Sequence, residues 1–331
     1  MLALHSCAAH KVPAVADLSA SALPVNTVWI DLVDASAAEV GFVERATGLH
    51  VPTPTELSEI ESSSRLRAEK DVLYLSTPLV SRSDTGEPVT TSVGFVLRHD
   101  LLITVRFAEL RAFRSFVEST TKPDTVHPSS AGAFVGLLEA MVDRMADVLE
   151  GIGTELDAVS HRIFRQEAAP TKVRRRPARE DADLREILRK IGRAGDLTSK
   201  IRDSLLGLGR MTPYVISLCA KWLPAEVKPH LETVRLDILS LNDYDAHLAN
   251  NVQLLLDATL GLINIEQNNI IKVLTIVSVV GVPPTLIASM YGMNFKTMPE
   301  YDWAWGYPYG LTLIAVSAIL PLLWFKLRGW L

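Results

Sequence analysis

The sequence predicts an α+β membrane protein with an N-terminal α/β domain, a long helical stalk and two C-terminal transmembrane helices. Two stretches without any charged side chain, residues 273–295 and 303–325, contain 23 residues each. A helix that crosses a bilayer needs about 20 predominantly apolar residues, so both stretches are long enough to be spans. The 331-residue chain has an ordinary 21% of charged residues but a mean hydropathy of +0.20. Its apolar residues are therefore concentrated in one region, and that region is the C-terminal one.

The composition excludes several classes of protein. Lys plus Arg is 33 and Asp plus Glu is 38, and the resulting net charge of −5 gives no reason to expect a nucleic-acid partner. The two cysteines, Cys7 and Cys219, exclude a disulfide scaffold and favour a reducing compartment. Gly207 and Gly209 do not complete a nucleotide-binding fingerprint, and no metalloprotease, kinase, P-loop or serine-hydrolase motif occurs. The sequence therefore predicts that the protein is not an enzyme.

Residues 1–127 are predicted to form the α/β domain. Runs rich in β-branched and aromatic residues predict strands, and runs with apolar residues at helical spacing predict helices. Strands are expected at residues 27–32, 72–75, 91–97 and 101–105, and helices at 36–46, 55–62 and 109–118. Residues 98–100 are predicted to be the turn of a hairpin between the last two strands.

Residues 128–269 are predicted to form the helical stalk. Helices are expected at residues 131–166 and 181–208, and a third helix starts after Pro229 and continues into the first span. This third element is expected to end at Pro283 and Pro284, which gives more than 50 residues, or about 80 Å at 1.5 Å per residue. Residues 270–331 form the predicted transmembrane domain, with spans at about 271–291 and 309–326.

The charges that flank the spans predict the orientation in the membrane. The link at residues 296–302 carries a net charge of −1, whereas Lys326 and Arg328 follow the second span and Lys272 precedes the first. By the positive-inside rule, the link lies outside and both termini are cytoplasmic. The prediction is a multi-pass protein of the cell inner membrane.

The N-terminal residues 1–24 show no charged-then-apolar pattern of a signal peptide. The first 270 residues are therefore expected to stay in the cytoplasm. His5, Cys7 and His10 are metal-ligand types, but they lie in a terminus that is expected to be frayed, so no metal site is predicted there.

A polar stripe follows one side of the long helix. With Asp257 at 0° and a rotation of 100° per residue, Asn268 lies at about +20°, Ile271 at about −40° and Val282 at about −20°. Leu274 and Thr285 lie near the edge of the same side, at about −100° and −80°. Such a stripe is typical of a helix–helix contact, and equally of one wall of an aqueous path. The stripe by itself does not choose between these two interpretations.

The segment after the first span favours the aqueous path. Residues 291–295 read Tyr-Gly-Met-Asn-Phe, and Met298, Pro299 and Glu300 follow. Carbonyl and carboxamide oxygens at the end of a membrane helix are dipoles without net charge, and they can hold a hydrated Mg²⁺ without stripping its water. No Asp or Glu occurs from Gln267 to Pro299, which argues against a proton-coupled carrier.

These motifs resemble the CorA family of magnesium and divalent-cation channels, whose signature is the triplet Gly292, Met293 and Asn294. The resemblance implies a homopentameric funnel in which the first spans line one pore, embedded in the lipid bilayer. It implies import of hydrated Mg²⁺, with Co²⁺ and Ni²⁺ also permeating, and closure when intracellular Mg²⁺ occupies regulatory sites. The triplet is then the selectivity filter, with Asn294 as the metal-facing residue. The implied pore line consists of Asp257, Asn268, Ile271, Leu274, Val282 and Thr285.

Two alternatives stay open at this point. A zinc transporter of the related ZntB type would carry Zn²⁺ through the same architecture. A two-span membrane-anchored sensor or scaffold would use the polar stripe only to pack helices.

Overall fold

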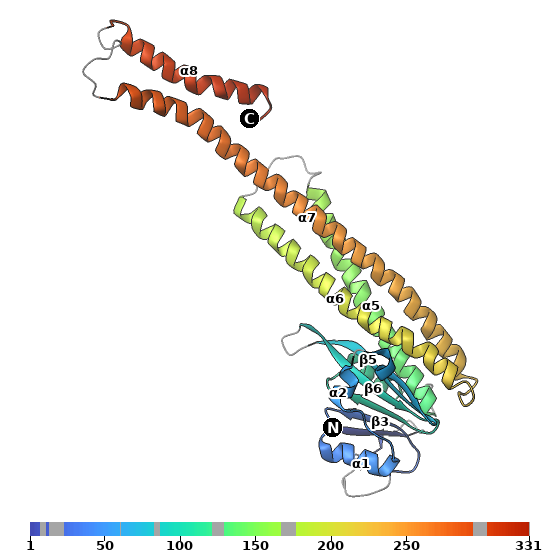
Figure 1. Cartoon of the computed structure of the whole chain (residues 1–331). Coiled ribbons are helices and arrows are strands. Elements are labelled where there is room, and N and C mark those ends of the chain that lie inside the picture. The colour runs from blue at the N-terminus through green and yellow to red at the C-terminus, as the bar shows by residue number, and fades with distance from the viewer. Residues whose placement is uncertain are drawn as a thin grey trace. The chain divides into compact units, whose positions relative to one another are not determined.

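The computed structural model describes residues 1–6, 11–12, 23–59, 61–82, 87–120, 129–166, 177–293 and 303–330. The chain divides into two compact units, Met1–Leu256 and Asp257–Leu331. The first unit contains a sheet covered by helices on both faces, and the second contains two apolar helical segments (Figure 1). The α+β architecture with two C-terminal membrane-length helices is confirmed.

The first unit is built around a seven-stranded sheet in the order β2-β1-β3-β7-β6-β5-β4. Its strands are β1 (Leu2–Ser6), β2 (Lys11–Val12), β3 (Thr27–Val33), β4 (Leu66–Glu69), β5 (Val72–Arg82), β6 (Pro88–Leu97) and β7 (Leu102–Arg106). Strands β3 and β7 pair in parallel, and the other neighbouring strands pair in antiparallel orientation. The sheet is therefore mixed, and its one parallel pair lies near the centre.

The structure confirms all four predicted strands: β3, β5 and β6 are longer than predicted, and β7 is shifted by one residue. The hairpin between β6 and β7 turns at residues 98–100, where Arg98 and Leu101 exchange both backbone hydrogen bonds. The expectation of a frayed N-terminus is wrong for residues 2–6, because they form β1 and pair with β3. The His5 ring stacks on Trp29 with 4.0 Å between ring centroids, while Cys7 and His10 lie outside the described residues.

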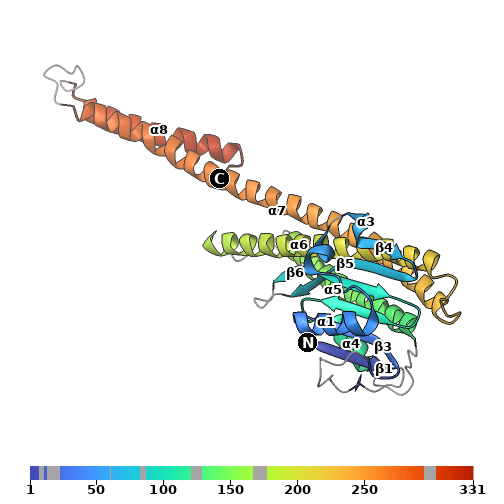
Figure 2. The ribbon, with the colours of Figure 1, turned by 60° about the horizontal axis from the view of Figure 1, so that its bottom comes forward.

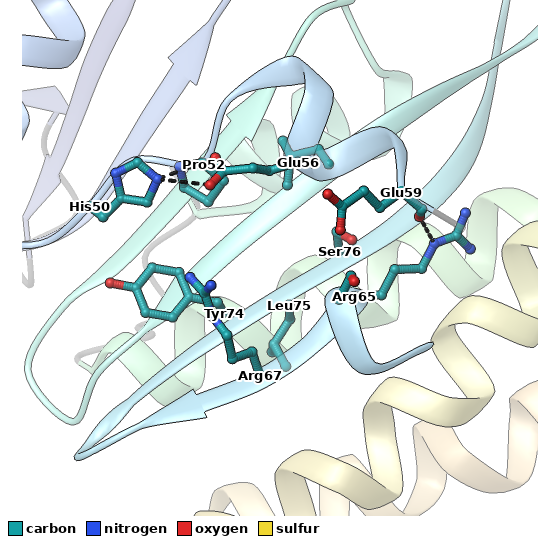
Figure 3. A pocket seen from close by; sticks show the side chains of 11 residues that line it. His50, Pro52, Glu56, Glu59, Arg65, Arg67, Tyr74, Leu75 and Ser76 are labelled. Atoms are coloured by element: carbon teal, nitrogen blue, oxygen red, sulfur yellow. Dashed lines mark hydrogen bonds and ion pairs between the residues drawn. The ribbon is translucent and has the colours of Figure 1, made fainter. Parts of the chain in front are cut away.

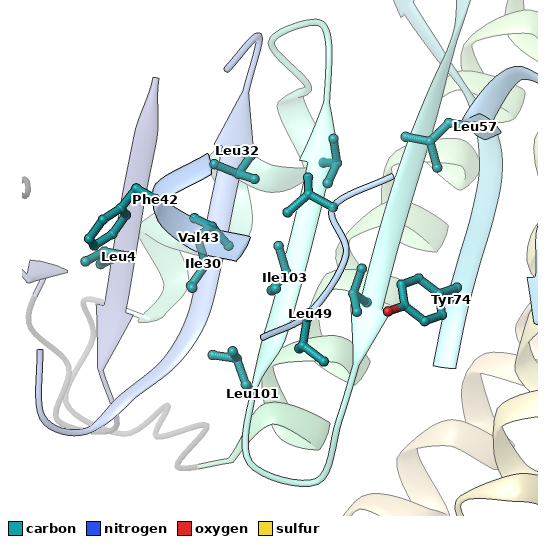
Figure 4. Packing of buried hydrophobic residues seen from close by; sticks show 13 residues of the cluster. Leu4, Ile30, Leu32, Phe42, Val43, Leu49, Leu57, Tyr74, Leu101 and Ile103 are labelled. Atoms are coloured by element: carbon teal, nitrogen blue, oxygen red, sulfur yellow. The ribbon is translucent and has the colours of Figure 1, made fainter. Parts of the chain in front are cut away.

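Three short helices lie near one face of the sheet: α1 (Ala37–Thr47), α2 (Pro54–Ser58) and α3 (Ser62–Arg65). Ser36 begins α1 with a capping box, in which its hydroxyl accepts from the Glu39 N–H and the Glu39 carboxylate accepts from the Ser36 N–H. The apolar side of α1 packs on the strands through Phe42 and Val43 (Figure 4). The core on this face consists of Leu4, Ile30, Leu32, Phe42, Val43, Leu49, Val51, Leu57, Tyr74, Val96, Leu101, Ile103 and Val105.

The opposite face of the sheet is covered by α4 (Arg111–Thr120), α5 (Ser130–Gln166) and α6 (Pro177–Leu218), as Figure 2 shows. Aromatic rings fill this interface: Trp29 lies 5.4 Å from Phe116, and Phe95 meets Phe134 edge to face at 5.5 Å. Because side chains alternate along a strand, Ile30 points to one face while Trp29 points to the other. The sheet is therefore the middle layer of three.

The long helices extend further than the sequence predicts. Helix α6 starts at Pro177 and continues through Pro213 to Leu218, ten residues beyond the expected end. Helix α7 (Val227–Tyr291) begins two residues before Pro229 and passes through Pro283 and Pro284 to Tyr291, so the prediction that it ends at these prolines is wrong. Helix α8 is Gly306–Leu327 and begins three residues before the expected start.

Candidate ion pathway

The six residues of the predicted pore line all lie on α7. The side chains of Ile271, Leu274 and Val282 are 60–66% exposed in the single chain. Asp257, Asn268 and Thr285 are exposed as well. Residues outside the predicted pore line, such as Val273 and Val277, are equally exposed, so residue type and not burial distinguishes the polar side of the helix.

The burial of α7 and α8 distinguishes membrane spans from the core helices of a soluble protein. The most apolar 18-residue window of α7 has a mean hydropathy of 2.0 and contains no buried residue. The corresponding window of α8 has a mean hydropathy of 1.9, and 6% of its residues are buried. Apolar helices left this exposed need another apolar environment, and a bilayer supplies it.

Thr275, which lies at about 0° relative to Asp257, and Thr285 both donate their hydroxyl protons to the backbone of α7. Thr275 Oγ1 donates to the Ile271 carbonyl over 2.8 Å. Thr285 Oγ1 donates to the carbonyls of Gly281 and Val282. Each hydroxyl oxygen therefore keeps its lone pairs, which can accept hydrogen bonds from the water molecules of a hydrated cation.

The prolines inside α7 leave two carbonyls without their usual donor, since proline has no N–H. Pro283 and Pro284 stand four residues after Val279 and Val280, whose carbonyls would otherwise accept in the helix. Prolines are tolerated in membrane helices where neighbouring groups satisfy the freed backbone, and Thr285 binds the adjacent carbonyls through its hydroxyl. The Thr285 bonds go to Gly281 and Val282 and not to the two freed carbonyls, so Thr285 does not replace the missing donors.

The first two residues of the signature triplet directly follow the end of α7. The Gly292 N–H donates to the Ala288 carbonyl over 3.0 Å, and the Met293 N–H donates to the Met290 carbonyl over 3.3 Å. Gly292 and Met293 therefore continue the helical hydrogen bonding past Tyr291. Asn294, the predicted metal-facing residue, lies outside the described residues.

A contact that the sequence analysis missed joins α7 to the tail after α8. Gly329 adopts a left-handed φ of 70° after the last turn of α8, and the Trp330 N–H donates back to the Phe325 carbonyl over 2.9 Å. The Trp330 ring then stacks on Phe325, and Lys272 Nζ lies 5.7 Å from the centroid of Trp330. Lys272 and Trp330 are 58 positions apart, so no sequence periodicity could have indicated this cation–π pair.

The first unit contains a hollow of about 240 Å³ between α2, α3 and the strands β4 and β5 (Figure 3). Its charged groups are largely engaged with one another or with the backbone. The His50 ring lies 3.1 Å from Glu44 Oε1 and 3.2 Å from Glu56 Oε2, and Arg65 Nε donates to the Glu59 carbonyl. Because its charged groups are engaged in these contacts, we interpret the hollow as a structural feature of the α/β fold.

Four acidic residues form a cluster on helices α5 and α7 within the first unit. Burial raises the pKa of the Asp143 carboxyl, and the nearby charges of Glu139, Asp147 and Asp237 raise it further. Glu139 in turn lies 2.8 Å from His230 Nδ1. Within the residues that the structure describes, no three His, Cys, Asp or Glu side chains are placed to hold a metal ion together.

These features define a two-span membrane protein. It has a mixed α/β unit, a long helix α7 whose apolar part is the first span and carries the polar stripe, and a second apolar helix α8. The chain belongs to the family described as CorA-like Mg²⁺ transporter protein, which it matches over residues 26–327. Members of this family are ion transporters and not enzymes, which confirms the resemblance and the prediction that the protein is not an enzyme.

Three similar proteins give the extent of the match. The chain is 32% identical over 308 residues to the magnesium transport protein CorA of Haemophilus ducreyi, covering 92% of each chain. The structure of the CorA magnesium transporter from Methanocaldococcus jannaschii matches 100% of this chain and 98% of its own, with a TM-score of 0.73 and 22% identity. The cytoplasmic domain of ZntB from Vibrio parahaemolyticus matches 74% of this chain and 91% of its own, with a TM-score of 0.52 and 15% identity. The likeness to ZntB shows the fold alone.

Proposed function

We propose that this chain forms a homopentameric channel that imports hydrated Mg²⁺ across the inner membrane, with Co²⁺ and Ni²⁺ also permeating. The observation that carries the proposal is the continuity of α7, which carries the polar stripe up to Tyr291, directly before Gly292 and Met293. Two spans in one chain cannot enclose a pore, so several copies must contribute. Membership of the CorA family and the names of its magnesium-transporting relatives support Mg²⁺ as the cargo.

In this proposal, Asp257, Asn268, Ile271, Leu274, Val282 and Thr285 line the pore, and Gly292, Met293 and Asn294 form its outer filter. Five Asn294 carboxamides offer oxygens to the water shell of Mg²⁺, which that ion gives up reluctantly. Intracellular Mg²⁺ closes the channel by binding to the residues 1–269. The transmembrane domain then comprises residues 270–331, and both termini are cytoplasmic.

Mg²⁺ flux into liposomes that contain the purified protein tests the proposal. The parent protein should carry Mg²⁺, and Asn294→Ala should nearly abolish the flux while the pentamer still assembles. Asn269→Ala is the matched control, because Asn269 is exposed on α7 at about 120° from Asp257, away from the polar stripe. A scaffold would carry nothing, and normal flux through a correctly assembled Asn294→Ala pentamer would falsify the filter assignment.

Ion preference and orientation need two further measurements. Competition by Co²⁺, Ni²⁺ and Zn²⁺ in the same assay gives the order of preference, and a Zn²⁺ flux well above that of Mg²⁺ would contradict the proposal. Asn294→Asp adds up to five negative charges and should slow Mg²⁺ release or change the ion preference, since conduction needs weak binding. A cysteine at Pro299 should react with an impermeant reagent from outside, and labelling after Trp330 from outside would contradict the orientation.

A further inference from the structure

A second cavity of the first unit lies on the α4–α5–α6 side of the sheet, distinct from the hollow of Figure 3. It has a volume of about 380 Å³, at the lower end of the range of about 300–1,000 Å³ that is typical of small-molecule sites. Helices α4, α5 and α6 and the strands β5 and β6 all contribute to its lining. The stripe on α7 and the signature triplet have no part in it, so the proposed transport function does not account for this cavity.

The interior of the cavity is apolar. Met141 and Met145 on α5 and Leu110, which precedes α4, are each 5% exposed or less. Ile201 on α6 is 1% exposed and Leu79 on β5 is 5% exposed. Methionine side chains are flexible and polarizable, and they adapt to hydrocarbon of varied shape. Val148 and Leu197 lie over this buried layer and are half-buried, so they offer open apolar surface to an aliphatic chain.

The rim of the cavity is positively charged. Arg111 and Arg114 are both exposed on α4, and within the described part of the chain neither guanidinium has a carboxylate partner. Arg144 also lines the cavity, with Nη1 3.6 Å from Asp147 Oδ2. The acidic rim residue, Glu109, lies 3.4 Å from Arg106 Nη1 and is engaged there. Arginine side chains bind carboxylates through two parallel hydrogen bonds, so the rim is complementary to an anionic head.

We propose that this cavity binds a single-chain aliphatic carboxylate, with its hydrocarbon against Val148 and Leu197 and its carboxylate at Arg111 and Arg114. The apolar interior alone would accept any small hydrocarbon, and the unpartnered arginines select an anion. The volume at the lower end of the small-molecule range favours one short chain over a two-chain lipid.

Octanoate binding to the full-length protein in lipid nanodiscs tests the proposal, with titration followed by ligand-observed NMR. Octanol and octyltrimethylammonium serve as the uncharged and cationic probes of equal chain length. Octanoate should bind most tightly, octanol more weakly, and octyltrimethylammonium weakest. Equal binding of all three probes, or binding by empty nanodiscs at the same level, would overturn the proposal.

Variants locate the binding within the cavity. The double variant Arg111→Gln/Arg114→Gln should weaken octanoate binding about tenfold and leave octanol unchanged, because both arginines are on the surface and only the head group loses its partners. Arg189→Gln, which removes an exposed arginine of α6 outside the cavity, should change neither. Val148→Phe fills the half-buried lining and should weaken both ligands. Parent-like octanoate binding by the double arginine variant refutes the inference regardless of how Val148→Phe folds.

Discussion

A buried ion pair between Asp31 and Arg106 ties the parallel strands β3 and β7 together. The Arg106 Nη2 atom lies 2.9 Å from Asp31 Oδ2, and both side chains are at most 7% exposed. Thr104 donates to Asp31 Oδ1 over 2.7 Å and accepts from Trp29 Nε1 over 3.0 Å, and the Arg106 guanidinium lies over the Phe113 ring. The polar atoms of this network are therefore satisfied inside the interface that α4 and α5 cover.

Removing one member of this pair should destabilise the first unit strongly. Asp31→Ala leaves the Arg106 charge buried without its counter-ion, and we expect a loss of about 3–5 kcal/mol. Glu109→Ala removes an exposed partner of the same arginine and should cost less than about 1 kcal/mol. Thermal unfolding of the full-length protein, followed by differential scanning fluorimetry, compares the two. Equal shifts in the unfolding temperature would contradict a special role for the buried pair.

At the scale of secondary-structure elements, α6 packs closely against β5 at Gly207. A Cβ at this position would lie 2.3 Å from Thr77 Oγ1 and 3.2 Å from the Pro78 ring. The sequence analysis found that Gly207 does not belong to a nucleotide-binding motif, and this packing gives the physical reason why the residue is glycine.

Gly207→Ala should therefore destabilise the protein by about 1–3 kcal/mol through overpacking, since the Pro78 ring cannot rotate away. Gly192→Ala on the same helix is the control, because within the described residues no atom outside the local helix backbone lies within 4 Å of the added Cβ. There the helix propensity of alanine should stabilise by about 0.5–1 kcal/mol. Thermal unfolding of the two variants should move in opposite directions, and a shift of the same sign would contradict the packing argument.

The α6–α7 pair contains a buried carboxyl whose ionisation opposes folding. Asp245 is 1% exposed, its Oδ2 accepts from Arg202 Nε over 2.8 Å, and its Oδ1 has no hydrogen-bond partner among the described residues. Burial raises the pKa of Asp245, and the Arg202 guanidinium lowers it only in part. Since the native state holds this proton more tightly than the unfolded chain does, Asp245 makes stability fall as pH rises from about 3.9, the ordinary value, through the raised pKa.

Asp245→Asn should therefore raise the unfolding temperature at pH 7.5, by about 2–4 °C for each 1 kcal/mol gained. The amide oxygen can still accept from Arg202, while the buried charge is gone. Asp203→Asn, on the exposed side of α6, should have little effect. Asp245→Asn should also lose the fall in stability that the parent protein shows as pH rises from the ordinary aspartate pKa through the raised pKa of Asp245. A lower unfolding temperature for Asp245→Asn at pH 7.5 would show that the charge stabilises this pair.

The elements that the sequence predicted well are those with a strong local pattern. The β-branched runs of β3 and β7, the hairpin turn and the apolar periodicity of α5 all appear in the structure where they were expected. Strand β4 reads Leu-Arg-Ala-Glu and lacks such a pattern, because it is an edge strand with mostly exposed side chains. Helix α7 continues beyond its prolines, and prolines are tolerated inside membrane helices, which a rule based on soluble helices does not include.

From the sequence, only those parts of the candidate pathway that lie on the single helix α7 could be predicted. The angular positions of Asp257, Asn268 and Val282 follow from the helical repeat, and α7 does carry them. By contrast, the Lys272–Trp330 pair and the cavity near Met145 join segments that are far apart in sequence. Such sites depend on tertiary packing, and no local period encodes them.

At the scale of the whole molecule, the proposed channel needs a barrier that closes without a charged gate. Ile271 and Leu274 are 60% and 66% exposed in the single chain, and both lie on or beside the polar stripe of α7. When five copies of α7 surround one pore, these aliphatic side chains form rings that can expel water from a narrow passage. A dewetted ring excludes a hydrated cation although it carries no charge.

Polar substitution should hydrate this ring and make the channel leak. Leu274→Asn and Leu274→Asp should carry Mg²⁺ even when internal Mg²⁺ is high enough to close the parent channel, and the aspartate variant should leak more because five carboxylates also attract the cation. Val273→Asn is the matched control, since Val273 is 60% exposed but lies at about 160° from Asp257, on the opposite side of α7. Efflux from liposomes loaded with Mg²⁺ measures the leak. Tight closure of both Leu274 variants, or an equal leak through Val273→Asn, would mean that the barrier lies at another level of α7.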